Sequence, residues 1–205
     1  MAANYSIHEI LTLEDGLLLP WLDLYETAFP PQERVVVSTF LGFLRERADG
    51  GSENRHMLCL LDKSGELVGI VFYTDSLECP ASFLWYLATV PAIRGKGAGA
   101  FFFKAILARL AQTSQALFWD LECPALCGTE EDRSLAGRRI QFYQRLGAFL
   151  LEGIHYTVQA NETLPPLTME LMLYPIAPLT ASEAFSLAQQ IFGDKIRQTG
   201  ELALR

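Results

Sequence analysis

The stretch FLWYLATVPAIRGKGAGA, residues 83–100, indicates most about how this chain folds. An apolar run ends at a short turn, and a loop follows in which Arg94, Lys96 and three glycines precede a helical pattern. Glycines let backbone N–H groups approach a ligand closely, and a helix start presents unpaired N–H groups and positive dipole charge. The stretch therefore predicts a buried strand over Phe83–Val90 and then a phosphate-binding loop at a helix start.

Hydrophobic spacing predicts the other elements. An edge strand at 4–10 precedes a helix that Pro30 and Pro31 stop, and a second helix runs from Glu33 to Arg47 with Val36 facing inward. Two apolar runs around Gly65 indicate a hairpin. Further on we expect a helix at 101–110, a strand at 116–123, an acidic loop at 124–133, a helix at 135–146, extended runs at 156–160 and 167–174, and a closing helix at 181–192.

The helix at 101–110 joins the strands at 83–90 and 116–123, which makes those two strands parallel through a right-handed crossover. The predicted fold class is therefore α/β, of the α+β type. Its sheet is mixed and mostly antiparallel with one parallel pair, and helices cover both faces. We expect one main domain over residues 1–180, with residues 181–205 forming a helical extension packed on it.

Composition narrows the function classes. The chain has 205 residues, half of them hydrophobic, and a net charge of −8, which argues against a nucleic-acid partner and mildly favours a cationic one. We see no signal peptide and no membrane-spanning run, and the scattered cysteines predict a reduced, cytoplasmic protein. Cys123 and Cys127 bracket a turn without a nearby histidine, so we expect no metal site.

The loop fits two known nucleotide-binding motifs poorly. A P-loop needs Gly-Lys followed by Ser or Thr, whereas Gly97 follows Lys96. A dinucleotide fingerprint is met loosely by Gly95, Gly97 and Ala100, with Asp120 twenty residues further on at a strand end. Four residues separate that loop from its strand, so an NAD(P)-dependent dehydrogenase stays the less favoured alternative.

The loop resembles the pyrophosphate motif of the GCN5-related N-acetyltransferase (GNAT) superfamily, which is Arg or Gln, two residues, Gly, one residue, and Gly or Ala. Residues 94–99, RGKGAG, match it throughout, and VPAI at 90–93 occupies the family's turn. RIQFYQRLGAF at 139–149 looks like the family's later signature, and YETAFP at 25–30 resembles its opening helix. The resemblance covers roughly residues 4–175. Ala136 and Arg139 depart from it, where relatives often carry asparagine and alanine.

The resemblance implies that acetyl-CoA is the co-substrate. It further implies that the strand at 83–90 splays from the next strand, which leaves backbone groups near Leu87 and Thr89 for the pantetheine arm and the thioester carbonyl. The residues implied to bind the cofactor are Leu87, Ala88, Thr89, Arg94, Gly95, Lys96, Gly97, Ala98, Gly99 and Ala100.

Proton transfer needs further side chains. In the family a tyrosine at the position of Tyr143 lies near the sulfur, and a phenol pKa of ~10 suits a donor to a leaving thiolate. Glu122 is our candidate base, and by strand alternation it shares a face with Asp120. Glu26, Glu33 and the acidic run 129–132 are candidates for holding a cationic amine, each with a solvated surface carboxylate as the plain alternative.

We therefore expect an N-acetyltransferase that moves an acetyl group from acetyl-CoA to a primary amine by direct attack in a ternary complex. The acceptor would be a small molecule or a peptide, with no nucleic acid and no membrane involved, and a homodimer is left open. The alternative from another class is a non-catalytic acyl-CoA-binding protein of the same fold, which would bind the cofactor without turnover.

Overall fold

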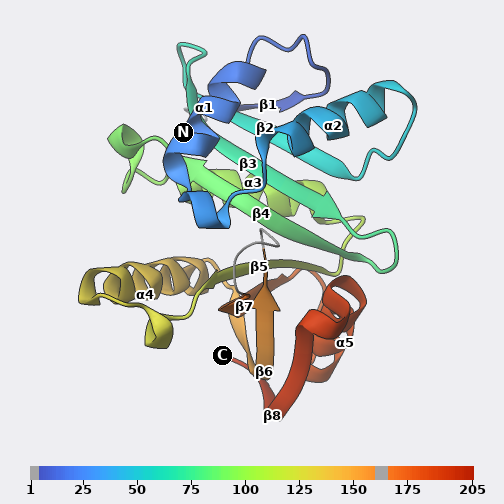
Figure 1. The fold of residues 1–205 in the computed structure, drawn as a ribbon, viewed down its shortest axis with the longest axis vertical. Helices are drawn as coiled ribbons and strands as arrows, with labels where there is room; N and C mark the ends of the chain where they lie inside the picture. Colours follow the sequence, from blue (N-terminus) through green and yellow to red (C-terminus); the bar gives the residue numbers. More distant parts are fainter. Residues whose placement is uncertain (1–4, 160–165) are drawn as a thin grey trace. The chain divides into compact units, whose positions relative to one another are not determined.

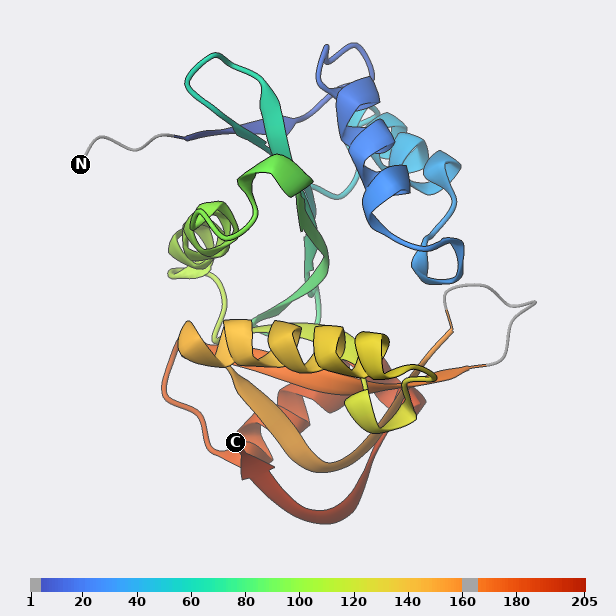
Figure 2. The same ribbon diagram turned by 90° about the vertical axis from the view of Figure 1, so that its left-hand side faces the viewer.

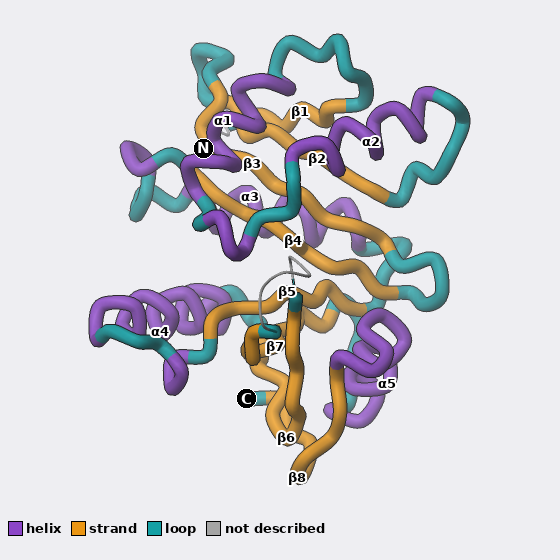
Figure 3. The backbone as a smooth tube through the Cα atoms, in the orientation of Figure 1, coloured by secondary structure: helices purple, strands orange, loops and turns teal. Residues whose placement is uncertain are grey.

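The computed structural model describes residues 5–159 and 166–205, so Ala160 of the run at 156–160 and residue 4 of the predicted edge strand lie outside the described residues. The elements can be followed in Figure 1 and, coloured by type, in Figure 3. In chain order they are β1 (Ser6–Ile10), α1 (Leu18–Ala28), α2 (Val37–Ala48), β2 (Arg55–Leu61), β3 (Leu67–Asp75), β4 (Ala81–Thr89), α3 (Ala98–Leu110), β5 (Ala116–Glu122), α4 (Glu130–Arg145), β6 (Phe149–Val158), β7 (Leu167–Pro175), α5 (Ala181–Phe192) and β8 (Ile196–Leu204).

The strands follow the order β1-β2-β3-β4-β5-β7-β6-β8 in the sheet. β4 and β5 pair in parallel through Ala81–Phe83 and Ala116–Phe118, whereas the ladders β1–β2, β2–β3, β5–β7, β6–β7 and β6–β8 are antiparallel. Helix α3 forms the crossover that connects β4 to β5. The predicted fold class, a mixed sheet with one parallel pair and flanking helices, is therefore confirmed.

The described chain divides into two compact units. The first, which we call the N-terminal unit, comprises residues up to Thr74 together with Leu84–Ala108. Within it, α1 and α2 cover one face of β1–β4 and α3 lies on the opposite face (Figure 2). Its core is aromatic. The ring centroid of Phe40 lies 5.1 Å from that of Trp21, 4.9 Å from that of Tyr25 and 5.1 Å from that of Phe72.

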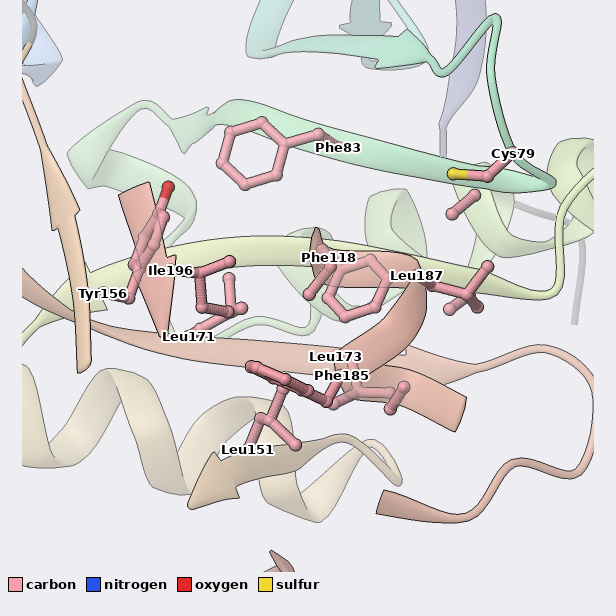
Figure 4. Close-up of a cluster of buried hydrophobic side chains, with 14 residues drawn as sticks. Cys79, Phe83, Phe118, Leu151, Tyr156, Leu171, Leu173, Phe185, Leu187 and Ile196 are labelled. Atoms are coloured by element: carbon pink, nitrogen blue, oxygen red, sulfur yellow. The ribbon is translucent and has the colours of Figure 1, made fainter. Parts of the chain in front are cut away.

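The second, C-terminal unit comprises Asp75–Phe83 and Arg109–Arg205. Side chains alternate along β5, so Phe118 and Trp119 point to opposite faces of its strands. Phe118 belongs to the buried cluster that α5 covers, shown in Figure 4, whereas Trp119 packs on Tyr143 of α4 with 4.6 Å between ring centroids. The two helices therefore cover opposite faces of this unit.

Two predicted boundaries and one predicted side-chain orientation were wrong. The second helix begins at Val37 rather than Glu33, and Val36, expected to face inward, is 69% exposed. Tyrosine hydroxyls explain this shift: Tyr25 donates to the Val35 carbonyl (3.0 Å) and Tyr86 to the Glu33 carbonyl (2.9 Å), so these carbonyls are not free for an α-helix that starts at Glu33. Glu33 instead ends a short 3-10 turn, Pro31–Glu33. The third helix begins at Ala98, three residues before the predicted start.

The region predicted as an acidic loop at 124–133 is a short 3-10 turn, Pro124–Leu126, followed by the first turn of α4. The Thr129 side chain caps this helix by accepting a hydrogen bond from the Asp132 N–H at 3.1 Å. Acidic side chains at this end offset the helix dipole, which gives the acidic run a structural reason.

The prediction that a helix ends the chain was also wrong, since β8 follows α5. Strand β8 pairs antiparallel with β6 through Tyr156↔Ile196 to Leu151↔Leu204. The polar middle of β8 is exposed, so its sequence lacks the hydrophobic alternation of a half-buried strand. Its backbone approaches Gly153 so closely that a Cβ there would lie 2.2 Å from the Glu201 carbonyl oxygen.

Candidate functional site

The loop between β4 and α3 is shaped by glycine. A 3-10 turn over Pro91–Ile93 is followed by Arg94, and Gly95 and Gly97 both adopt positive φ, 75° and 84°. Such angles strain any residue with a Cβ. The glycines let the chain reverse twice before Ala98, where α3 begins.

The start of α3 leaves amides available to a ligand. The first intrahelical donor is the N–H of Phe101, which bonds the Gly97 carbonyl at 2.9 Å. Helix geometry gives the N–H groups of Ala98, Gly99 and Ala100 no intrahelical acceptor. These three amides are therefore available to a ligand, and the positive end of a helix favours an anion.

Two cations stand beside these amides. Arg94 and Lys96 are both exposed, and within residues 5–159 and 166–205 neither forms an ion pair. The backbone N–H groups of both are used in local turns, to the carbonyls of Pro91 and Ile93 at 3.2 Å each, which fixes the loop's shape. The loop thus combines preset backbone donors with two free positive charges, a combination suited to a pyrophosphate.

Strand β4 carries the other predicted cofactor residues, Leu87, Ala88 and Thr89. The Val90 N–H donates to the Val68 carbonyl of β3 at 2.9 Å. Because backbone groups alternate in direction along a strand, the N–H groups of Leu87 and Thr89 point away from β3. The parallel ladder of β4 with β5 runs over Ala81–Phe83. These two amides therefore have the direction that the resemblance requires.

Tyr143 lies on the buried face of α4 and is 8% exposed. Burial raises the pKa of its phenol above the ordinary value, and the nearby Arg139 charge only partly opposes this. The hydroxyl therefore stays protonated at neutral pH, as a proton donor must. The sequence placed Tyr143 on a helix, and the structure adds its aromatic neighbour Trp119, whose ring plane is tilted by 48° to that of Tyr143.

Glu122 ends β5 and forms an ion pair with Arg139 of α4. Arg139 is a position where the sequence departs from the family pattern, and its side chain contacts this carboxylate. The pairing ties the end of β5 to α4. If Glu122 acted as a base, the proton that it accepts would have to compete with the Arg139 guanidinium for the carboxylate.

Asp120 was not among the predicted catalytic residues. Its half-buried carboxylate accepts a hydrogen bond from the Tyr156 hydroxyl of β6 at 3.1 Å. Burial, and to a smaller extent the neighbouring Glu122 charge, raises the pKa of Asp120 to about 6, against the lowering effect of that hydrogen bond. The signal was present in the sequence, since alternation places Asp120 on the same face as the buried Phe118.

The other acidic candidates have local partners. Glu26 on α1 lies 3.7 Å from Arg34, and Glu33 contributes its backbone carbonyl to the Tyr86 hydroxyl. In the acidic run 129–132, Glu130 pairs with Arg133 one helical turn on at 3.2 Å. The carboxylates of Glu26 and Glu130 are therefore each close to an arginine of the same local segment.

The predicted cofactor residues, 87–89 and 94–100, belong to the N-terminal unit, whereas Glu122 and Tyr143 belong to the C-terminal unit.

In the described part of the chain, no three His, Cys, Asp or Glu side chains are grouped as a metal ion would require. No helix there is long and apolar enough to cross a bilayer.

Comparison with solved structures identifies the fold. A protein from Bacteroides thetaiotaomicron, whose name assigns it to the GNAT family of acetyltransferases, aligns with a TM-score of 0.70 at 23% identity over 92% of this chain and 98% of its own. The ribosomal-protein-S18-alanine N-acetyltransferase of Escherichia coli aligns at 0.56 and 16% identity, covering 85% and 96%. A phosphinothricin acetyltransferase from Sinorhizobium meliloti, in complex with AcCoA, aligns at 0.55 and 15%, covering 84% and 88%.

The sequence matches no family model and none of the curated proteins. The structural likeness nevertheless extends over most of the chain. The chain therefore has the GNAT fold, as the motifs predicted.

Proposed function

We propose that this chain is an acetyl-CoA-dependent N-acyltransferase of the GNAT superfamily that acetylates a primary amine. The observation that carries the proposal is the loop before α3, where amides without an intrahelical acceptor adjoin two exposed cations, the donors that a pyrophosphate would need. The solved acetyltransferase in complex with AcCoA, which shares the fold, supports the choice of cofactor.

In the proposed reaction, the amine nitrogen attacks the thioester carbonyl carbon of acetyl-CoA, and the carbonyl becomes an oxyanion. A backbone N–H near Leu87 or Thr89 would stabilise that charge, since fixed amides suit developing oxyanions. The intermediate then collapses, the C–S bond breaks and the thiolate leaves. Tyr143 would protonate the thiolate, while a carboxylate removes the proton that the amine loses.

The base in this scheme was predicted to be Glu122, and we keep it as a candidate. Because Arg139 already pairs with its carboxylate, a proton can be accepted there only at the expense of that ion pair. Direct attack needs no covalent enzyme intermediate.

The dehydrogenase alternative loses support at Asp120. A dinucleotide site would use this carboxylate for ribose hydroxyls. Here the carboxylate accepts from Tyr156, a member of the buried cluster under α5. The 3-10 turn Pro91–Ile93 also separates β4 from the glycines, whereas the dinucleotide fingerprint follows its strand directly.

Calorimetric titration of the whole chain with acetyl-CoA, and separately with NADH, tests the proposal. We expect micromolar acetyl-CoA binding that Arg94→Glu weakens at least tenfold, because the reversed charge repels the pyrophosphate. Arg197→Glu, an exposed charge reversal on β8, is the matched control and should leave the affinity unchanged. Binding of NADH without acetyl-CoA would instead establish the dehydrogenase.

Cofactor binding without turnover of any amine would establish the non-catalytic alternative. A cytoplasmic location, a homodimer, and the division at residue 180 into a catalytic domain and an extension also remain part of the proposal. Gel filtration and limited proteolysis test the last two.

A further inference from the structure

Two cysteines bracket the turn between β5 and α4, and the proposed function uses neither of them. Cys123 follows β5 directly, Cys127 lies just before the cap of α4, and Pro124–Leu126 forms the 3-10 turn between them. Both thiols are free and half-buried, whereas Cys59 and Cys79 are free but buried. Exposure helps to decide which thiols are oxidised, so a pair of partly exposed thiols on one turn is a candidate for reversible redox chemistry.

The turn holds both sulfur atoms close to one backbone hydrogen bond. The Leu126 N–H donates to the Cys123 carbonyl at 3.0 Å, and the Cys127 thiol donates to the same oxygen, with 3.5 Å between Sγ and O. The Cys123 sulfur in turn accepts from the N–H groups of Ala125 and Leu126. Each thiol therefore contacts the backbone of the turn that separates them.

These contacts bring the two side chains within the range of a disulfide. Bond lengths place a carbonyl oxygen less than ~2.8 Å from its own Cα. Because the Cys127 sulfur is 3.5 Å from the Cys123 oxygen, it lies within about 6 Å of the Cys123 Cα. A disulfide sets the two Cα atoms about 4.4–6.8 Å apart, so rotation of the side chains is the main movement that it requires.

The two thiols have different partners. The Cys123 thiol lies inside the sheet edge beside the Glu170 carboxylate of β7, and burial, followed by this carboxylate, raises the pKa of that thiol. The Cys127 thiol is bonded instead to a neutral carbonyl. Since the thiolate is the form that attacks, these surroundings favour Cys127 as the first thiol to react and Cys123 as the second.

We propose that Cys123 and Cys127 are a modification site at which hydrogen peroxide forms a reversible disulfide within the chain. The Cys127 thiolate attacks one peroxide oxygen, the O–O bond breaks, and hydroxide takes up the thiol's proton and leaves as water. Cys127 is then a sulfenic acid. The deprotonated Cys123 attacks the Cys127 sulfur, the S–S bond forms, the S–O bond breaks, and the second hydroxide leaves as water with the Cys123 proton. Two thiols lose two electrons, and one peroxide is reduced to two water molecules.

The disulfide would close the connection between β5 and α4. It would replace the hydrogen bond from Cys127 to the Cys123 carbonyl and would withdraw the Cys123 thiol from Glu170. Thr129, which caps α4, follows closely after Cys127. Oxidation at this turn is therefore placed to act on the start of α4. Disulfides that form and break in reducing surroundings usually serve as sensors rather than as structural links.

Peroxide titration of the full chain tests this inference. The reduced protein is treated with hydrogen peroxide, the remaining thiols are alkylated with iodoacetamide, and unreduced peptides are identified by mass spectrometry. We expect a disulfide joining Cys123 to Cys127 to form about tenfold faster than Cys59 or Cys79 is oxidised, and dithiothreitol to reverse it. Burial raises the pKa of Cys59 to about 12, which leaves that residue almost no thiolate.

Substitutions separate the two steps. Cys123→Ser should stop the reaction at the Cys127 sulfenic acid, which dimedone traps, whereas Cys127→Ser should form neither the disulfide nor a dimedone adduct at Cys123. Glu170→Gln removes a charge that disfavours the Cys123 thiolate, so it should shorten the lifetime of the sulfenic acid about threefold. Cys79→Ser, which removes a buried thiol bonded to Ser76, is the control and should change none of these rates.

Three results would overturn the inference. They are oxidation without a Cys123–Cys127 link, a link that joins two chains, and oxidation of Cys59 as fast as that of the pair. A dimedone adduct at Cys123 in Cys127→Ser, formed as fast as the Cys127 adduct in Cys123→Ser, would contradict the order of the steps. Peptide mapping of the wild-type chain decides the main point even where a variant fails to fold. The test needs no acyl donor, so it is independent of the proposed function.

Discussion

The loop before α3 and the sheet around Asp120 differ in how they are built. The loop is made of consecutive residues, 94–100, and its binding groups are backbone amides set by two glycines of positive φ. The Asp120 cluster is made of side chains from β5, β6 and α5, brought together from positions up to 72 residues apart, since 192 − 120 = 72. A local motif can be recognised in a sequence, whereas a cluster of this kind exists only once the strands have paired.

The first prediction concerns Tyr143 on α4, a candidate catalytic residue that acts through its side chain rather than its backbone. Tyr143→Phe should lower kcat at least about 100-fold, the usual contribution of a positioned proton donor, and leave acetyl-CoA affinity unchanged. Stopped acetylation assays with calorimetry measure both. Tyr73→Phe, a buried tyrosine of the N-terminal unit that stacks on His56, is the control. Equal kcat values for the Tyr143 variant and the wild type would exclude Tyr143 as the donor.

The second prediction concerns the cost of keeping Asp120. Its folded-state pKa, about 6, lies above the ordinary 3.8, so stability is lost as the pH rises through 6. Asp120→Asn removes this loss. We therefore expect the free energy of unfolding of the variant, relative to that of the wild type, to rise by about 3 kcal/mol from pH 4 to pH 8. Urea denaturation at both pH values measures it.

Asp62→Asn is the control of opposite sign for that experiment. Hydrogen bonds from Ser64 and Glu66 lower the pKa of Asp62, so its contribution is present at high pH and lost as the pH falls. If Asp120→Asn showed no gain at pH 8, the ionised Asp120 carboxylate would not destabilise the folded chain, and the raised pKa would be contradicted.

The third prediction tests the backbone origin of the loop. Gly97 and Gly65 have the same φ, 84°, and a Cβ at either would meet nothing within 4 Å. Both Gly→Ala variants should therefore lose similar stability, about 1–2 kcal/mol, from left-handed strain. Gly97→Ala alone should also weaken acetyl-CoA binding about tenfold, as read by calorimetry. Equal affinities in the two variants would show that the amides before α3 do not contact the ligand.

The smallest expected effect concerns the acidic start of α4. Thr129→Ala should lower the free energy of unfolding by about 1 kcal/mol through loss of the helix cap. Ser186→Ala, on the exposed face of α5, should change it little. An additional tenfold rise in KM for a cationic amine would reinstate the acidic run as a binding site and contradict its structural assignment.

Particular residues show how far sequence reasoning reached. The parallel pair, the hairpin at Gly65 and the loop at 94–100 were predictable, because each depends on neighbours in the sequence or on one crossover. Val36 and β8 were not. The start of α2 depends on hydroxyls of Tyr25 and Tyr86, the second from a strand about 50 residues away, since 86 − 36 = 50. Strand β8 forms because its backbone pairs with the free edge of β6, although the β8 segment has no alternation of polar and apolar residues.

By itself, the sequence determined the class of fold, the position of the glycine-rich loop before α3 and the helix that carries Tyr143. Each of these follows from hydrophobic period, glycine conformation and a local motif, which act over a few residues. Only the tertiary structure decided that Glu122 is neutralised by Arg139 whereas Asp120 keeps an unpaired charge beside Tyr156. The two carboxylates are alike in sequence. What separates them is desolvation and the choice of partner, and both depend on which side chains the folded chain brings near.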